Sequence, residues 1–476
     1  MAEGAPSGRF EASAHDRRVR LVAAESAARP GLTNRQWIAV AVLAVAMVAA
    51  LVIKPGVTGL AFVLLVEAGF VACALWRLLL VMTPRTDVQP VDAPMEWPRY
   101  TILAALHDEA AVVPQLIARL SRLEYPADKL EGFLLLEAHD RATIAAANLC
   151  ERPDWLHILV VPSGQPQTKP RALNWGLLHA AGDLVTVYDA EDDPDPLQLK
   201  EAAARFAAAP ASLACLQAPL RIRSRLRART AAPFLDRQFA AEYAALFEVI
   251  LPAMARLGLP FPLGGTSNHF RVDVLRAVGG WDAWNVTEDA DLGFRLWRHG
   301  WRLGMISRPT YETPPERLEV WLPQRTRWLK GYLQTVIVHL RRPLGLGPRG
   351  LLALTMTLGM ALLAAVTHAP SLAWIVSGVM ISVRAGISPD LPLHALAVLA
   401  VGAMSAWMTC HVGARRAGGR YGPIEMASAP AYWSLLTLAL IQAVWRLIRE
   451  PHVWDKTPHQ PDGGDEAASV AGRGPT

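Results

Sequence analysis

Long apolar stretches near both ends of the chain restrict its fold more than any other feature. Two such stretches precede a central region of ordinary polarity and four follow it, at 37–53, 57–82, 351–366, 371–383, 391–414 and 431–448. About 17–25 apolar residues cross a bilayer as a helix. We therefore expect two transmembrane helices within residues 35–83 and about four within residues 349–448, with a separate domain between them.

Basic residues beside the first two stretches predict their orientation. Arg29 and Arg35 precede the first stretch, and Arg85 follows the second. Cytoplasmic segments carry an excess of Lys and Arg, so the N-terminal segment 1–34 and the central domain are both expected in the cytoplasm. Segment 1–34 lacks the early apolar core of a signal peptide. These features predict a multi-pass protein of a bacterial-type cytoplasmic (inner) membrane.

The later spans are harder to count. The stretch at 371–383 is short for a full span, and His368 and Pro370 separate it from the stretch before it, so the two can form a tight hairpin. Four crossings would return the C-terminus to the cytoplasm. The loop around Arg415 and Arg416 would then face outward, against the usual distribution of positive charge.

Overall charge and cysteine spacing exclude some classes of protein. The chain has 476 residues and a net charge of +5, with part of the excess beside the apolar stretches. This charge suits an anionic membrane surface, and no nucleic-acid-binding motif is present. The four cysteines are far apart and lack the spacing of a zinc site.

Short apolar runs alternate with amphipathic stretches across residues 97–342. The runs at 100–106, 132–137, 156–161 and 184–188 are typical of buried strands. Strands that alternate with helices predict a largely parallel α/β sheet. Ligands bind such sheets at the carboxyl ends of the strands, where this chain has His107-Asp108-Glu109, residues 137–140 and residues 189–193.

Asp189-Ala190-Glu191 directly follows the run at 184–188. Side chains at i and i+2 of an extended segment point the same way. The two carboxylates can therefore share one divalent cation, since magnesium and related ions prefer oxygen ligands. The alternative is a capping role before Pro194.

Two further motifs lie downstream. Thr287-Glu288-Asp289 can supply a carboxylate base, although Thr and Asp are also common at helix N-termini. Gln324-Arg325-Thr326-Arg327-Trp328 lies on an expected helix that begins near Leu318 and is rich in Trp and Arg. The indole of Trp328 offers a flat face for a sugar ring, and the guanidinium of Arg327 can contact a phosphate. The alternative is an amphipathic helix at the membrane surface.

The three motifs, in this order between apolar blocks, resemble the family-2 glycosyltransferases. They are most similar to the membrane-embedded synthases of cellulose, chitin, hyaluronan and bacterial β-glucans, and the resemblance runs from about Tyr100 to His459. It implies a GT-A-type, Rossmann-like domain inserted between membrane helices. It also implies a hexosyltransferase (EC 2.4.1-like) that uses Mg²⁺ or Mn²⁺.

The resemblance assigns roles to individual residues. Asp289 matches the catalytic base. Nucleotide contacts are expected from His107, Glu109, Glu137, Lys169 and Asp189, and cation ligands from Asp189 and Glu191. Contacts to the acceptor and diphosphate are expected from Glu288, Gln324, Arg327 and Trp328. Residues 449–460 are similar to a gating loop, with Trp454 and Thr457 as its candidate residues, and residues 461–476 are expected to be disordered.

The sequence leaves three functional hypotheses. The first is an inverting β-glycosyltransferase that moves a hexose from a nucleotide sugar, UDP-glucose being the preferred donor, to a growing polysaccharide and exports it. An accessory export subunit would fit this hypothesis. The second is a glycolipid synthase that adds one β-glucose to diacylglycerol or a similar lipid. The third is a non-catalytic membrane transporter or scaffold.

Overall fold

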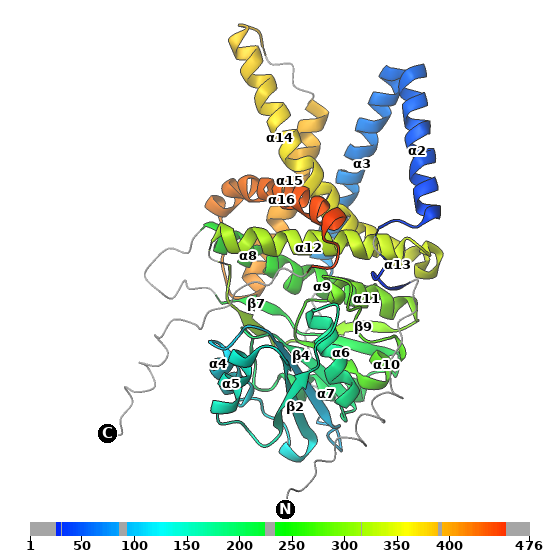
Figure 1. Cartoon of the computed structure of the whole chain (residues 1–476). Coiled ribbons are helices and arrows are strands. Elements are labelled where there is room, and N and C mark those ends of the chain that lie inside the picture. The colour runs from blue at the N-terminus through cyan, green and yellow to red at the C-terminus, as the bar shows by residue number, and fades with distance from the viewer. Residues whose placement is uncertain are drawn as a thin grey trace, which may run out of the picture.

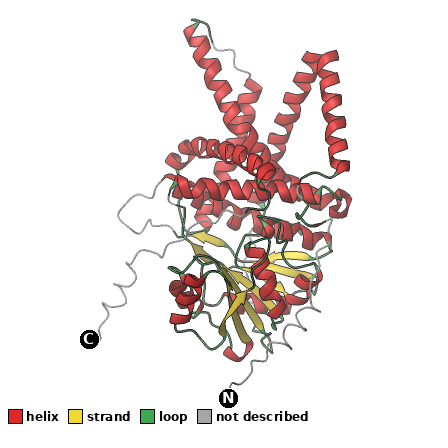
Figure 2. Cartoon of the chain, in the orientation of Figure 1, coloured by secondary structure: helices red, strands yellow, loops and turns green. Residues whose placement is uncertain are grey.

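Strands and helices of the central region form an α/β domain, and long helices cover one side of it (Figure 2). The computed structural model describes residues 25–29, 31–84, 93–223, 234–315, 317–388 and 393–453. The candidate gating residues Trp454 and Thr457 and the segment 461–476 lie outside these residues.

A seven-stranded sheet organises the domain, in the order β3-β2-β1-β4-β8-β6-β9. Its strands are β1 (Tyr100–Leu106), β2 (Leu130–Glu137), β3 (Leu156–Val161), β4 (Leu184–Tyr188), β6 (Leu213–Gln217), β8 (Asn268–Arg271) and β9 (Arg302–Met305). Only β8 runs antiparallel to its neighbours β4 and β6. The predicted, mostly parallel α/β sheet is confirmed, and the carboxyl ends of β1, β2 and β4 lie at one edge.

A smaller sheet with the order β5-β10-β7 lies beside the carboxyl end of β4. It comprises β5 (Asp193–Pro194), β7 (Leu220–Ile222) and β10 (Thr310–Glu312). Its β10 pairs in parallel with β7 and antiparallel with β5. This sheet closes the end of the domain that carries the polar residues of the β4 turn.

Successive residues of the central strands pack on opposite faces of the large sheet. Leu103 and Leu135 belong to one apolar core, whereas Ile102 and Leu134 belong to a second core. Parallel sheets usually need such cover on both faces. One face is covered by α6 (Lys169–His179), α10 (Val272–Ala277) and α11 (Glu288–Arg298), and the other by α4 (Val113–Leu120), α5 (Arg141–Leu149) and α7 (Gln198–Ala208).

Long apolar helices flank this domain in the sequence. They are α2 (Asn34–Ile53), α3 (Pro55–Met82), α14 (Met360–Arg384), α15 (Leu393–Arg416) and α16 (Pro423–Arg449). Among the described residues, five helical segments are long and apolar enough to cross a membrane, the third being 343–384. Figure 1 shows α2, α3 and α14 rising away from the domain, whereas α16 lies across it beside α12 (Leu318–His339).

The structure differs from the expected hairpin near Pro370. The stretches 351–366 and 371–383 lie on one continuous helical run, formed by α13 (Gly347–Leu354), η6 (Thr355–Gly359) and α14. Pro370 lies inside α14, and His368 contacts the carbonyl oxygen of Pro430 on α16 through Nε2, at 3.1 Å. A neighbouring helix therefore stabilises α14 at the point where the sequence suggested a turn.

The basic loop that follows α15 lies on the side of the α/β domain. Arg416 donates through Nη1 to the carbonyl oxygen of Glu248, at 2.8 Å. Glu248 belongs to η4 (Leu246–Ile250), which continues α8 (Phe234–Ala245) toward α9 (Leu251–Arg256). This contact places the end of α15 beside the α/β domain.

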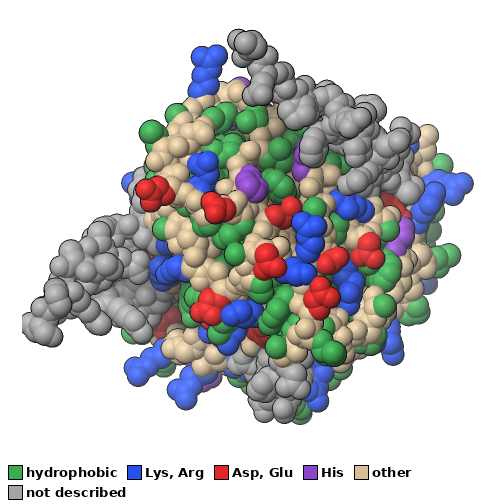
Figure 3. Space-filling view, turned by 90° about the horizontal axis from the view of Figure 1, so that it is seen from below, with side chains coloured by type: hydrophobic (Ala, Val, Ile, Leu, Met, Phe, Trp, Pro, Cys, Tyr) green, Lys and Arg blue, Asp and Glu red, His purple; other side chains and the backbone are tan. Residues whose placement is uncertain are grey.

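The face of the domain that points away from the apolar helices is polar. Figure 3 shows Lys, Arg, Asp and Glu side chains interspersed on this face. Mixed charge of this kind is typical of a surface in water. On α2, by contrast, no side chain is buried and Leu43 and Val45 are exposed, as expected for a helix surrounded by lipid.

Substitutions of two glycines on α15 can test how closely this helix approaches the domain. A Cβ on Gly413 would lie 2.5 Å from the backbone carbonyl of Ala244 on α8, whereas a Cβ on Gly402 would meet nothing within 4 Å. We expect Gly413→Ala to lower the thermal unfolding midpoint in detergent, at a cost of about 1–3 kcal/mol. Gly402→Ala is the matched control, and an equal effect of both substitutions would contradict the close contact.

Candidate active site

One cavity at the carboxyl ends of β1, β2 and β4 brings together the residues predicted from the sequence. The described candidates that line it are His107, Glu109, Glu137, Lys169, Asp189, Glu191, Glu288, Asp289, Gln324, Arg327 and Trp328. They come from three strand ends and from helices α6, α11 and α12. Residues as far apart in the sequence as His107 and Trp328 therefore line one cavity.

Gly265 lies where three of these elements meet. A Cβ at this position would lie 3.4 Å from Asp289 Oδ2, 3.9 Å from Lys169 Nζ and 4.0 Å from Asp189 Oδ2. Lys169 forms an ion pair with Asp189 and donates to the carbonyl oxygen of Gly265 at 2.7 Å. The absence of a side chain at residue 265 leaves room for a ligand between a carboxylate, a cation and a second carboxylate.

The turn after β4 is held by a carboxylate that does not line the cavity. Asp192 is fully buried, and its Oδ2 accepts from the backbone N–H of Asp189 at 2.6 Å and from the hydroxyl of Thr266. Burial, together with Asp189 and Glu191, raises the pKa of Asp192. Asp192 thus holds the turn that presents Asp189 and Glu191 to the cavity.

The motif Thr287-Glu288-Asp289 stands at the start of α11. Thr287 occupies the N-cap position, but its side chain makes no capping hydrogen bond to the described residues of this helix. Burial raises the pKa of Glu288 to about 8, and Asp289 adds to that shift. Burial also raises the pKa of Asp289 to about 6. Asp289 can therefore accept a proton near neutral pH, as a general base must.

Arg327 extends this charged cluster from α12. Burial lowers the pKa of its guanidinium, while Glu288 and Asp189 act in the opposite direction. Lys169 and Arg327 thus face the acidic residues from two different helices. Cations in this arrangement can bind a diphosphate and stabilise its charge when it leaves.

At the end of the cavity near β2, the predicted residue Glu137 has a fixed partner. Arg171 donates through Nη2 to both carboxylate oxygens of Glu137, at 2.8 and 2.6 Å. Gln167 lines the cavity nearby and contacts His139 at 2.8 Å. The sequence prediction treated Arg171 only as part of the basic element that begins at Lys169, and it did not include Gln167.

The opposite end of the cavity is aromatic and apolar. Trp328 packs against Tyr243, with ring centroids 6.1 Å apart. The other side chains that form this wall are Leu220, Leu246, Phe247, Leu263 and Tyr332. A buried carboxylate, Glu312, also lines the cavity and was not predicted. Its signal in the sequence is weak, because it lies on a three-residue strand.

Trp328 is held from behind by Arg325, which the prediction treated only as part of the motif. The guanidinium carbon of Arg325 lies 4.4 Å from the centre of the Trp328 ring. Arg325 also donates to Glu242 on α8 at 2.8 Å and to the hydroxyl of Tyr432 on α16 at 2.9 Å. One buried cation therefore joins three helices behind the aromatic wall.

The carboxylates of Asp189 and Glu191 are suited to a divalent cation that is bound partly by the phosphates of a substrate. Asp189 and Glu191 both line the cavity. In the part of the chain that the structure describes, no group of three or more His, Cys, Asp or Glu residues forms a complete cation cage. Magnesium is commonly bound by one or two carboxylates together with substrate phosphates, so two carboxylates suit a cation bound to a nucleotide diphosphate.

Family models match this part of the chain. The model described as glycosyl transferase family 2 matches residues 101–265, and that of glycosyl transferase family group 2 matches residues 184–410. Together the matches extend from β1 through the cavity residues into α15.

Curated relatives include a probable glycosyltransferase, a beta-monoglucosyldiacylglycerol synthase and a cellulose synthase catalytic subunit. The probable glycosyltransferase YdaM of Bacillus subtilis is 25% identical over 52% of this chain and 58% of its own length. A beta-monoglucosyldiacylglycerol synthase of Synechocystis is 28% identical, over 52% of this chain and 50% of its own. The cellulose synthase 1 catalytic subunit of Komagataeibacter xylinus is 25% identical, over 51% of this chain and 32% of its own length. This chain thus covers less than two thirds of each relative.

A solved structure shows the same fold. The mannosyltransferase PcManGT from Pyrobaculum calidifontis, in complex with GDP-Man and Mn²⁺, superposes with a TM-score of 0.51 at 20% identity. The match covers 80% of this chain and 99% of the other. The expected GT-A arrangement of the sheet and its covering helices is confirmed.

The buried carboxyl of Glu288 predicts a pH-dependent stability. A carboxyl whose folded-state pKa is raised favours folding less as pH rises from its unfolded pKa toward the folded value, here from about 4.5 to about 8. We therefore expect Glu288→Gln to raise the thermal unfolding midpoint above that of the unsubstituted protein, by an amount that grows from about pH 5 to about pH 8. Glu151→Gln, at an exposed position, is the control; a difference that is constant with pH would contradict the assignment.

Proposed function

Because the chain belongs to glycosyltransferase family 2 and has the GT-A fold, we propose that it transfers a hexose from a nucleotide sugar to an acceptor at the membrane surface, with inversion. One observation carries this proposal. Asp289, Lys169 and Asp189 surround the open position at Gly265, and Gln324, Arg327 and Trp328 line the same cavity from α12.

The proposed reaction is a single displacement. Asp289 accepts the proton of the acceptor hydroxyl as that oxygen forms a bond to the anomeric carbon of the donor sugar. The bond from this carbon to the diphosphate breaks on the opposite face, so an α-linked donor gives a β-glycosidic product. Lys169 and Arg327 stabilise the negative charge of the departing diphosphate.

The cation would bind at Asp189 and Glu191 in this proposal. Mg²⁺ or Mn²⁺ would neutralise the charge on the diphosphate oxygens. Lys169 contributes a fixed positive charge beside Asp189, and the buried Asp192 keeps both ligands on one turn. His107, Glu109 and Gln167 line the end of the cavity near β1 and β2, where the base of the nucleotide would bind.

A growing glycan is the preferred acceptor. Trp328, Tyr243 and Tyr332 line the acceptor end of the cavity, and aromatic faces pack well against sugar rings. The similarity to a cellulose synthase catalytic subunit supports this preference. We propose UDP-glucose or a related UDP-hexose as the donor.

A membrane lipid is the second candidate acceptor. Leu220, Leu246, Phe247 and Leu263 form an apolar wall in the same cavity, and one relative is named as a beta-monoglucosyldiacylglycerol synthase. An acceptor such as diacylglycerol would place its hydroxyl near Asp289 and its chains toward this wall and the lipid. The non-catalytic hypothesis is set aside, because the cavity contains both the base and the cationic residues.

We also propose that α2, α3, α14 and α15 span the membrane, while α12 and α16 lie on its cytoplasmic surface. This arrangement places Arg35 at the start of α2 and the loop with Arg416 on the cytoplasmic side. It agrees with the usual distribution of positive charge in a bacterial inner membrane. Because α12 lines the cavity and lies on the membrane surface in this arrangement, the cavity would be next to the lipid.

The test of function uses purified full-length protein in lipid nanodiscs with Mg²⁺ or Mn²⁺. Radiolabelled UDP-glucose, UDP-N-acetylglucosamine and UDP-galactose are offered in turn, with and without diacylglycerol. Label in long chains without added lipid supports the glycan acceptor. Label only in a chloroform-soluble product that requires diacylglycerol supports the lipid acceptor instead. Absence of transfer from all three donors would contradict the UDP-hexose proposal.

The role of Asp289 makes a separate prediction. Asp289→Asn removes the proton acceptor but keeps the size of the side chain, so the turnover rate is expected to fall by about 10²–10⁴-fold. Donor affinity, measured by calorimetry, should change by no more than about a factor of two. Asp128→Asn, an exposed carboxylate, is the control. Full activity of Asp289→Asn would rule out Asp289 as the base.

A further inference from the structure

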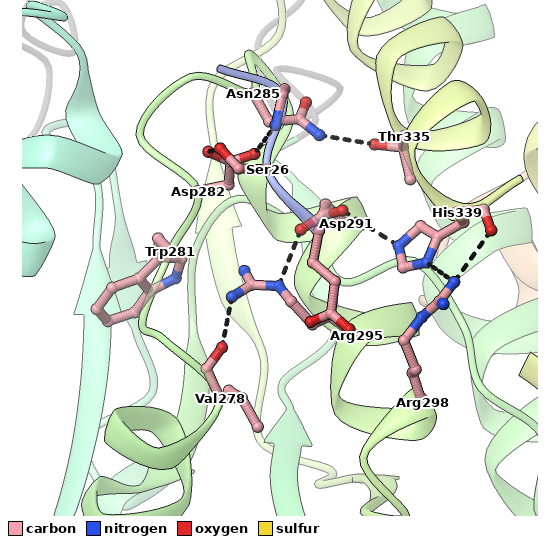
Figure 4. A network of polar contacts seen from close by, with 12 residues as sticks. Ser26, Val278, Trp281, Asp282, Asn285, Asp291, Arg295, Arg298, Thr335 and His339 are labelled. Atoms are coloured by element: carbon pink, nitrogen blue, oxygen red, sulfur yellow. Dashed lines mark hydrogen bonds and ion pairs between the residues drawn. The ribbon is translucent and has the colours of Figure 1, made fainter. Parts of the chain in front are cut away.

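The loop formed by residues 282–287, here named the base loop, leads into the start of α11 and so positions Asp289. It contains no strand, yet Asp282, Asn285 and Thr287 in it are all buried. Its shape must therefore be held by other parts of the chain. Figure 4 shows contacts from two of the segments that hold it, Ser26 before α2 and Thr335 on α12. Thr168 and His452 also contact this loop, at the carbonyl oxygens of Ala283 and Trp284.

The first segment consists of residues 25–29, here named the strap. Ser26 donates from its hydroxyl to Asp282 Oδ1 at 3.1 Å, and the backbone N–H of Ala27 donates to Asp282 Oδ2 at 2.5 Å. The backbone N–H of Trp284 also donates to Oδ1 at 3.1 Å. Asp282 thus accepts from the strap and from its own loop, and both of its oxygens are used.

The carboxylate of Asp282 depends on these donors because it is only 1% exposed. Burial raises the pKa of Asp282 and the nearby Asp291 adds to this, whereas the N–H of Ala27 acts against it. When a buried carboxylate loses its hydrogen-bond donors, the loss in folding free energy is much larger than for an exposed carboxylate. Loss of the strap would therefore force Asp282, and the loop with it, to move or to admit water.

The strap is itself fixed to the domain. Glu25 contacts His299 Nε2 at 3.0 Å. Arg341 donates to the carbonyl oxygens of Ser26 and Arg29, at 2.7 and 2.8 Å. Glu25, Ser26 and Ala27 are each less than 9% exposed. These contacts distinguish the strap from a terminal segment that merely lies on the surface.

Helix α12 holds the base loop from the other side. Asn285 donates to Thr335 Oγ1 at 3.1 Å, and the N–H of Val286 donates to Gln334 Oε1 at 3.1 Å. Farther along the same helix, His339 contacts the fully buried Asp291 at 3.1 Å. Figure 4 shows the pairs Asn285–Thr335 and Asp291–His339 near the contact between Ser26 and Asp282. The base loop is therefore enclosed between the strap and the helix that carries Trp328.

The strap also leads directly into the first apolar helix. Thr33 caps α2, and Gln36 on its first turn donates to the carbonyl oxygen of Ile337 on α12, at 2.9 Å. The strap, the start of α2 and the end of α12 are thus joined by hydrogen bonds. A change in any of them would be transmitted to the loop that carries the base.

We propose that residues 25–29 are a positioning element of the active site, which acts through Asp282 to hold Asp289 in place against α12. The proposal rests on the proposed transfer reaction for its kinetic consequence. Neither Asp282 nor the strap touches the cavity, so both position the base without contacting substrate. Their loss should affect the chemical step and leave donor binding unchanged.

Ala27→Pro in the full-length protein tests this directly, because proline removes the N–H that Asp282 accepts. In nanodiscs with Mn²⁺ and the active donor, kcat is expected to fall by about 10–100-fold while the donor KM stays unchanged. Ser26→Ala removes only one of the two contacts and should have a smaller effect of the same kind. Ala211→Pro is the matched control, since Ala211 is exposed in a turn whose second position accepts proline.

Hydrogen exchange gives a second readout that needs no turnover. In Ala27→Pro, the amides of Val286 and Thr287 are expected to exchange about tenfold faster, while those of β1 and β4 stay protected and show that the domain is folded. Unchanged exchange at residues 286 and 287, or a raised donor KM with normal kcat, would overturn the proposal. Because exchange is measured without donor, it decides the role of the strap even if the protein transferred no hexose.

Discussion

The close contact between α12 and the base loop is the constraint on which the site depends. A Cβ on Gly331 would lie 2.2 Å from the hydroxyl oxygen of Thr287, so only glycine allows this approach. One turn earlier the same helix carries Arg327 and Trp328, which line the cavity. The distance between the candidate base and the aromatic wall of the cavity is therefore set by backbone packing, and a flexible side chain could not fix it as well.

Charge in the cavity is arranged so that each buried group depends on another. Burial raises the pKa of both Glu288 and Asp289, and the nearby Asp289 and Asp189 add to the shift of Glu288. Lys169 and Arg327 offset part of this negative charge from α6 and α12. A diphosphate with its cation would add charges of both signs to a space already organised for them, so little reorganisation is needed at the moment of reaction.

Much of the cavity could be predicted because its residues follow strand ends or form short motifs. Asp189 comes directly after β4, and parallel strands bring such positions together whatever lies between them in the sequence. The pairing of Glu137 with Arg171 could not be foreseen, since it depends on how α6 packs against β2. The same holds for α14, where an apolar helix continued through Pro370 because a neighbouring helix stabilised it. The contact between Ser26 and Asp282 joins residues 256 positions apart, and no local pattern marks it.

The packing around Arg325 has a consequence for how such an enzyme can change during evolution. Trp328 is both a wall of the cavity and a partner in the cluster formed by Arg325, Glu242 and Tyr432. Replacement of this indole would disturb the packing of three helices together with the cavity wall. Under the proposed function, a change of acceptor at this position would therefore also lower the stability of the fold. Leu246 and Leu263 line the same cavity without belonging to this cluster. Under the proposed function, new acceptor preferences would therefore arise most readily through these apolar neighbours, while Trp328 stays constant.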